Sequence, residues 1–185
     1  MAGFALEEGD RATAAAVLVC FNGILRPVEC MLTAGQCTFD LDRGVVHLNL
    51  GFTKGGKRSG TAERVTIDEL EAVLLLAELL QGQPAGTQLY PRGTGGFRRA
   101  FRRLVQSIGA DPDRYKPYSL RRGGATHHFR ILGSLSKTCV RGRWRHQPTA
   151  RIYIQDGVAM LERHGLSSRE RRLIAKGKSL LRRRL

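Results

Sequence analysis

Apolar residues cluster with helical spacing in the first part of the chain. The stretch from Asp10 to Phe21 is almost wholly apolar, which predicts a buried helix with Asp10 as its N-cap and Asn22-Gly23 at its end. A second helix is expected over residues 27–33, because Pro27 suits a first helical turn. The chain is therefore expected to open with two helices, the first of them buried.

Three short segments with strand character follow these helices. Residues 36–41 lead into a turn, and residues 45–50 then alternate between apolar and polar side chains. Residues 63–67 form the third segment, after a glycine-rich loop over residues 53–60. Tight connections between short strands predict an antiparallel meander with one face covered by helices.

The pattern returns to helical spacing after the third strand. Helices are expected over residues 69–80, with Asp68 as the cap, and over residues 97–108, where apolar side chains face one way and four arginines the other. Two more are expected, from the cap Ser119 through Arg130 and over residues 149–163, with loops over 82–96 and 111–117.

These elements predict an α/β fold class that is mainly helical, with a small three-stranded antiparallel sheet. One domain is expected over residues 1–166, followed by a basic C-terminal tail or helix over residues 167–185. Hydrophobic residues make up 42% and charged residues 25% of the 185 residues, which is ordinary globular usage and argues against a disordered chain.

The net charge of the chain indicates which class of molecule it binds. There are 31 Lys and Arg against 16 Asp and Glu, so the net charge is +15, which favours a polyanionic partner, here expected to be double-stranded DNA. No apolar run approaches the roughly 18 residues of a membrane span. The four cysteines form no CxxC pair, so we expect reduced thiols in an intracellular, DNA-associated protein, in a prokaryotic cytoplasm or a eukaryotic nucleus.

Four separated segments carry the candidate chemistry. They are Gly23 to Glu29, the loop lysine Lys54, Tyr118 to Thr126, and Gly142 to Tyr153, in which Tyr153 follows Trp144 by nine positions. Together and in this order they resemble the catalytic domain of the tyrosine recombinases, the phage-integrase family. The resemblance covers roughly residues 12–163, and the matched motifs are Leu25-Arg26-Pro-Val-Glu29, Leu120-Arg121, and Gly142-Arg-Trp144 with Thr149 and Ile152-Tyr153.

The resemblance implies DNA strand cleavage and rejoining through a covalent 3′-phosphotyrosine, in site-specific recombination or DNA integration. Arg26 and Arg121 would clamp the phosphate, because each planar guanidinium offers two parallel donors. Tyr153 would be the nucleophile, whereas Tyr90, Tyr115 and Tyr118 lack its sequence context.

Other positions have supporting roles in this interpretation. Lys54 would protonate the leaving 5′ oxygen, with Lys57 as a competitor because the glycine-rich loop leaves the register open. Tyr118 and Trp144 would be assisting donors, with Trp144 donating its indole N–H to the phosphate, and Glu29 would hold Arg26 in position. Neither a cofactor, a metal nor a small-molecule substrate is expected.

Two departures from the family pattern widen the range of functions. Tyr118 stands where the family usually has His, and a tyrosine serves less readily as a base at neutral pH. Few residues precede the first core helix, where the family usually carries an N-terminal clamp domain. The alternatives are a catalytically impaired DNA-binding remnant, a topoisomerase-like relaxing enzyme and, more weakly, an RNA-binding protein. An active member of the family would assemble as a homotetramer on DNA.

Overall fold

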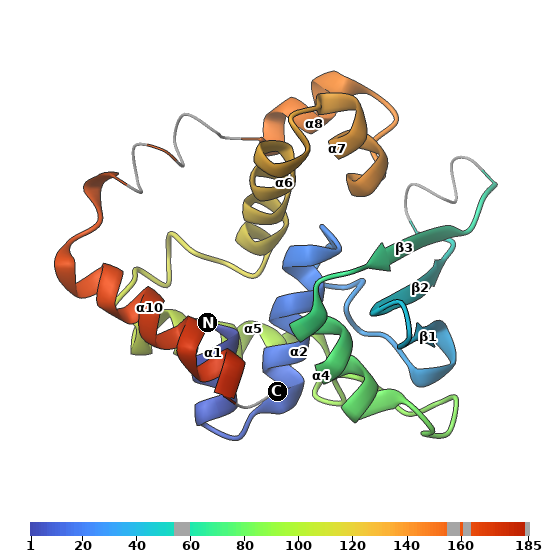
Figure 1. Cartoon of the computed structure of the whole chain (residues 1–185), viewed down its shortest axis with the longest axis horizontal. Coiled ribbons are helices and arrows are strands. Elements are labelled where there is room, and N and C mark those ends of the chain that lie inside the picture. Colours follow the sequence, from blue (N-terminus) through green and yellow to red (C-terminus); the bar gives the residue numbers. More distant parts are fainter. Residues whose placement is uncertain (54–59, 155–159, 161–163, 184–185) are drawn as a thin grey trace.

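The structure is a computed structural model that describes residues 1–53, 60–154, 160 and 164–183. Lys54 and Lys57, the two candidates for the general acid, lie outside the described residues. The described part is mainly helical, with one small sheet (Figure 1). This confirms the predicted fold class.

The sheet is an antiparallel meander of three strands. They are β1 (Cys37–Asp40), β2 (Val45–Gly51) and β3 (Glu63–Ile67), in the order β1-β2-β3. Val46 pairs with Ile67 and Leu48 with Val65, and these four side chains are buried. The alternation along each strand therefore turns one face of the sheet toward the core, as the sequence pattern predicts.

Helix α2 (Arg11–Asn22) occupies the middle of the molecule. Its N-terminus is capped by Asp10, whose carboxylate accepts a hydrogen bond of 3.0 Å from the backbone N–H of Thr13. It packs against α4 (Leu70–Leu80), α5 (Gly93–Ser107) and α6 (Tyr118–Leu132), and α4 in turn contacts β1 and β2 (Figure 1). The main core thus lies between α2, α4, α5 and the sheet.

A second cluster stands above this core. Helices α6 (Tyr118–Leu132), α7 (Leu135–Gly142) and α8 (Gln147–Tyr153) gather around a small apolar cluster, at the top of Figure 1. Helix α6 joins it to α2 at very short range, since a Cβ at Gly124 would collide with the carbonyl oxygen of Phe21. Glycine at this position therefore allows α6 to lie directly on the end of α2.

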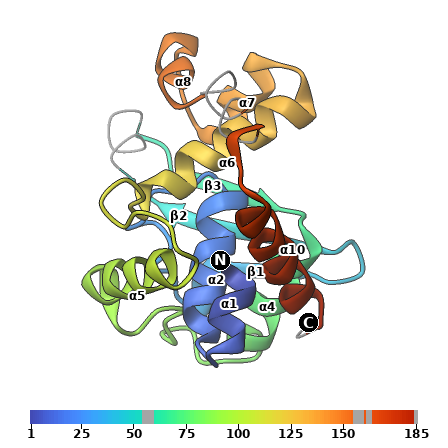
Figure 2. The same cartoon turned by 90° about the vertical axis from the view of Figure 1, so that its left-hand side faces the viewer.

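The basic C-terminal segment is helical. Helix α10 (Ser168–Arg183) packs on α1 (Ala2–Glu7), and both views show the two helices side by side (Figures 1 and 2). An ion pair of 3.2 Å joins Lys176 to Glu7. Among the described residues, no helix has both the length and the apolar character needed to cross a membrane.

The expected helix over residues 27–33 is wrong. Residues 27–30 form a turn, and the backbone beyond it bonds to a distant segment, with Leu89 N–H donating to Leu32 O and Ala34 N–H to Thr87 O, both at 2.8 Å. Leu32 and Ala34 therefore satisfy these backbone groups with residues 87–89; Thr33 between them is extended, and a short 3₁₀ helix, η1 (Ala34–Gln36), follows.

Other element boundaries also differ from the sequence prediction. Helix α5 begins at Gly93, within the expected loop, because glycines let its first turn lie against Arg92. Helix α7 was not predicted. Helix α8 begins two residues earlier than expected and ends at Tyr153, because Ile154 is extended, and the remainder of the expected helix falls largely outside the described residues.

Candidate active site

The turn that follows α2 holds the first candidate residue. The backbone N–H of Arg26 donates to a Glu29 carboxylate oxygen at 2.7 Å, and its guanidinium donates to the other carboxylate oxygen at 2.5 Å. The side chain of Arg26 is 32% exposed, whereas that of Glu29 is 6% exposed. Glu29 thus fixes Arg26 from the protein side and leaves part of the guanidinium open to solvent.

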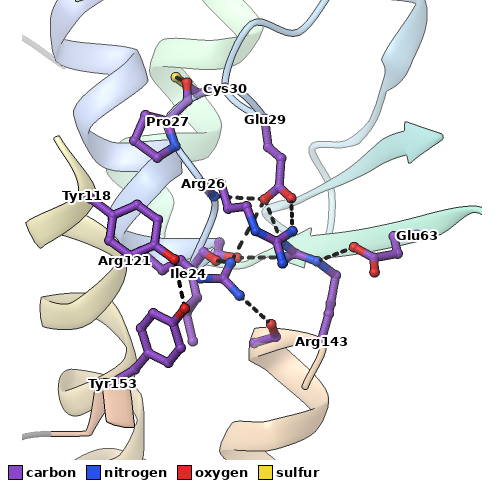
Figure 3. A network of polar contacts seen from close by, with 12 residues as sticks. Ile24, Arg26, Pro27, Glu29, Cys30, Glu63, Tyr118, Arg121, Arg143 and Tyr153 are labelled. Carbon is purple, nitrogen blue, oxygen red and sulfur yellow. Dashed lines mark hydrogen bonds and ion pairs between the residues drawn. The ribbon is translucent and has the colours of Figure 1, made fainter. Parts of the chain in front are cut away.

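Glu29 is the meeting point of three guanidinium groups (Figure 3). Besides Arg26, its carboxylate accepts a hydrogen bond of 2.7 Å from Arg143 and lies 3.9 Å from a guanidinium nitrogen of Arg121. The three arginines come from the turn after α2, from the end of α7 and from α6. Glu29 therefore lies among three converging cations, and the cluster keeps a net positive charge even with Glu63, whose carboxylate also binds Arg143.

Arg121 is the most deeply buried of the three, with only 1% of its side chain exposed. Its guanidinium donates to the carbonyl oxygens of Ile24 and of Gly142, the latter at 3.0 Å. Its Nε has no hydrogen-bond partner among the described residues. Burial, together with the charges of Arg143 and Arg26, lowers the pKa of Arg121 to about 10, so the group remains a cation at neutral pH.

Tyr153, at the end of α8, lies against Arg121 and Trp144. The rings of Trp144 and Tyr153 are stacked with centroids 4.9 Å apart, and the Arg121 guanidinium carbon lies 4.8 Å from the Trp144 ring and 5.5 Å from the Tyr153 ring. Gly142 permits this packing, because a Cβ there would overlap the indole. The two aromatic rings thus cover the guanidinium and hold it through cation–π contacts.

Tyr118 is the first residue of α6, and its side chain reaches Tyr153. Its hydroxyl oxygen lies 2.7 Å from that of Tyr153, as Figure 3 shows. Burial and the hydrogen bond to Tyr153 raise the pKa of Tyr118 above its usual value of 10, which keeps it protonated at neutral pH. The two phenols therefore share one hydrogen bond beside Arg121.

The structure thus brings Arg26, Glu29, Tyr118, Arg121, Trp144 and Tyr153 into one site, from elements far apart in the sequence. Their catalytic roles stay a prediction.

Two hollows adjoin this site. Thr53, the last described residue before the segment that carries Lys54, lines a small pocket of about 230 Å³ together with Arg26 and Glu29. A larger groove of about 760 Å³ extends from Arg26 and Tyr118 along α5, and the basic side chains that line it also include Arg98, Arg102 and Lys116.

Sequence reasoning missed two members of the site. Arg143 donates from Nε to Glu63 at 2.9 Å as well as to Glu29, and its side chain is 8% exposed. Glu63 begins β3 and is 16% exposed. Because Arg143 lies between two other arginines, Arg141 and Arg145, nothing in the sequence distinguishes it; only its position beside Trp144 could have drawn attention to it.

A cluster of cations beside a hydroxyl is suited to an anion that gains charge during reaction. The guanidinium groups of Arg26 and Arg121 can stabilise the non-bridging oxygens of a phosphate, and a phenol held beside them can act as a nucleophile. Among the described residues, no group of three or more His, Cys, Asp or Glu side chains could hold a metal ion.

Comparisons with known proteins place this arrangement in a structural context. No family model matches the sequence, and no curated protein matches it. Among solved structures, the chain is similar to the XerH site-specific recombinase in a pre-cleavage complex with its difH substrate, with a TM-score of 0.58 and 16% sequence identity. The similarity covers 84% of this chain and 46% of the XerH chain, so this chain spans less than half of its structural neighbour. The chain therefore has the fold of a tyrosine recombinase catalytic domain.

Proposed function

We propose that this protein cleaves and rejoins DNA strands through a covalent 3′-phosphotyrosine, as a recombinase or integrase does. One observation carries the proposal: the guanidinium groups of Arg26 and Arg121 both reach Glu29, and the Tyr153 ring lies 5.5 Å from Arg121. A scissile phosphate bound by both arginines would therefore lie beside the Tyr153 hydroxyl.

In the proposed reaction the Tyr153 oxygen attacks the phosphorus, and the bond from phosphorus to the 5′ oxygen breaks. The Tyr153 proton passes to the solvent, either directly or through the Tyr118 hydroxyl, which accepts it while releasing its own proton to water. The 5′ oxygen takes a proton from Lys54 or Lys57 and leaves as a hydroxyl. Arg26 and Arg121 stabilise the charge that grows on the non-bridging oxygens. Because the phosphate ester bond is retained on Tyr153, attack by a 5′ hydroxyl reverses the step and rejoins the strand.

A conformational step precedes cleavage in this proposal. Arg121 is 1% exposed and lies behind the stacked rings of Trp144 and Tyr153, while Tyr153 is hydrogen-bonded to Tyr118. A phosphate would first meet Arg26, which is 32% exposed, and would reach Arg121 once α8 or the two rings shift. The Tyr118–Tyr153 hydrogen bond then exchanges for a contact between Tyr153 and the phosphate.

Double-stranded DNA is the proposed partner because of charge as well as chemistry. The chain carries a net charge of +15, and the groove beside the site is lined by four cations, Arg26, Arg98, Arg102 and Lys116. Such contacts release counterions, so four phosphate contacts should weaken binding by roughly 10²-fold when the salt concentration is raised from about 50 to 200 mM. Assembly of four protomers on DNA is part of the same proposal.

Covalent trapping tests the proposal directly. A randomised library of nicked, end-labelled duplexes, in which the cleaved fragment diffuses away, should leave an adduct that survives denaturing electrophoresis. Tyr153→Phe should abolish the adduct, whereas Tyr90→Phe should retain it, since Tyr90 is a buried core residue hydrogen-bonded to Thr13. Absence of an adduct in the wild-type protein would refute the proposal.

A DNA-binding remnant without catalytic activity is the second candidate. The burial of Arg121 favours it, because a guanidinium already bonded to two backbone carbonyls serves the fold without any substrate. A remnant would bind DNA with steep salt dependence and give no adduct. A relaxing enzyme would instead give an adduct and relax supercoiled DNA without recombinant products.

A further inference from the structure

Arg143 adopts a backbone conformation that side chains disfavour. Its φ of 58° and ψ of 37° lie in the left-handed region, where glycine is the usual residue. The residue follows Gly142, ends α7 and caps it through its backbone N–H, which donates to the carbonyl oxygen of Val140 at 3.1 Å. An arginine here is strained, so contacts elsewhere must hold it in place.

The side chain of Arg143 supplies those contacts. Its Nε donates to Glu63 at 2.9 Å, one terminal nitrogen donates to Glu29 at 2.7 Å, and the other donates to the carbonyl oxygen of Gly23 at 3.2 Å. Only 8% of the side chain is exposed, and both carboxylates are largely buried. One guanidinium thus joins the end of α7 to three separate segments: β3, the end of α2 and the turn of Arg26.

The segment that Arg143 holds is the one that carries the proposed nucleophile. Trp144 is the next residue, and its ring stacks on Tyr153. The Arg143 guanidinium also binds Glu29, whose carboxylate in turn binds Arg26. The position of the aromatic pair relative to Arg26 therefore depends on the contacts of Arg143 as well as on the burial of Arg121.

We propose that Arg143 is a positioning residue that sets Trp144 and Tyr153 against the Arg26–Glu29 turn. The proposal rests on the proposed function for its catalytic consequence, but its geometric content does not depend on that function. Lysine cannot reproduce it, because an ammonium lacks the planar fork that spans two carboxylates and a carbonyl. Glycine would suit the backbone and remove the link, which makes Arg143→Gly an informative variant.

Fluorescence tests the geometric content without any substrate. Trp144 is the only tryptophan in the chain, and it is 9% exposed. In Arg143→Gly its emission should shift to longer wavelength, and acrylamide quenching should rise roughly twofold as the segment opens locally, with the far-ultraviolet circular dichroism unchanged. Arg145→Gly, on the other side of Trp144, is the matched control and should behave as the wild type. Unchanged emission and quenching in Arg143→Gly would overturn the proposal.

Single-turnover trapping on the nicked duplex library tests the catalytic consequence. Arg143→Gly should slow adduct formation by about 10²-fold, as expected for misplacement of a reacting group by about 1 Å, while DNA affinity at equal salt changes little. The rate of adduct formation in Arg143→Lys should lie between the rates of the wild type and of Arg143→Gly. If the wild type forms an adduct and Arg143→Gly forms it equally fast, the positioning role is refuted and the function stands. If the wild type forms no adduct, the proposed function fails and the fluorescence result alone decides the position of Arg143.

Discussion

Replacing Glu29 by glutamine tests the electrostatic core of the site. The substitution keeps the size and shape of the side chain but removes the negative charge that three guanidinium groups share. Glutamine can still accept a hydrogen bond from Arg26 or Arg143. The cations of Arg26, Arg121 and Arg143 then face one another with less compensation, because Glu63 contacts only Arg143 among them.

The magnitude follows from the contacts. Hydrogen bonds to charged groups contribute about 1.5–3 kcal/mol each, and the substitution weakens the two that the guanidinium groups of Arg26 and Arg143 make to the carboxylate. Breaking a buried ion pair by removing one charge costs about 3–5 kcal/mol. Since Arg26 is 32% exposed and partly screened by solvent, we expect the lower end, about 3 kcal/mol of unfolding free energy.

Urea denaturation at neutral pH and thermal melting measure this loss. For a chain of this size, about 3 kcal/mol corresponds to a fall in Tm of roughly 6–12 °C. Glu8→Gln provides the matched control, because Glu8 is exposed and its substitution should change the unfolding free energy by less than about 0.5 kcal/mol. A loss in Glu29→Gln as small as that of the control would refute the idea that Glu29 balances the three cations.

Two further predictions concern the cluster formed by α6, α7 and α8. Gly142→Ala places a methyl group where the Trp144 ring lies. The unfolding free energy should therefore fall by about 1–3 kcal/mol, and the fluorescence emission of Trp144 should shift. A variant with the stability and emission spectrum of the wild type would contradict this packing. Burial, followed by the charge of Arg141, lowers the pKa of His128 to about 4 from its ordinary 6.5, so the unfolded chain binds the proton more readily. Stability should therefore be full above pH 6.5 and decline as the pH falls toward 4, by up to about 3 kcal/mol, and urea titrations should show a weaker decline in His128→Gln. Equal pH slopes in the two proteins would exclude this role of His128.

The sheet and the buried helices could be predicted from the sequence because their signals are local. The alternation in residues 45–50 and 63–67 settles which face of the meander is buried, and the apolar run after Asp10 gives α2. The segment 27–33 could not be assigned correctly, because its backbone partners lie more than 50 residues away at Thr87 and Leu89. Helix α7 is short, and its N-cap Ser134 is the main local signal that it has.

The residues of the candidate site could likewise be predicted only in part. The ordered motifs select Arg26, Arg121 and Tyr153, and these residues do lie together. The role of Arg143 could not be predicted, because it follows from a left-handed residue at the end of an unpredicted helix. The hydrogen bond between Tyr118 and Tyr153 likewise depends on how α6 and α8 pack, which no local pattern records.

In the proposed reaction the Tyr153 hydroxyl attacks a phosphate held by the arginine cluster. Since the Tyr118 hydroxyl lies only 2.7 Å away, the most direct measurement is to digest the trapped adduct and locate the modified tyrosine by mass spectrometry. We expect the nucleotide remnant on the peptide that contains Tyr153. A remnant on Tyr118, or on any other tyrosine, would contradict it.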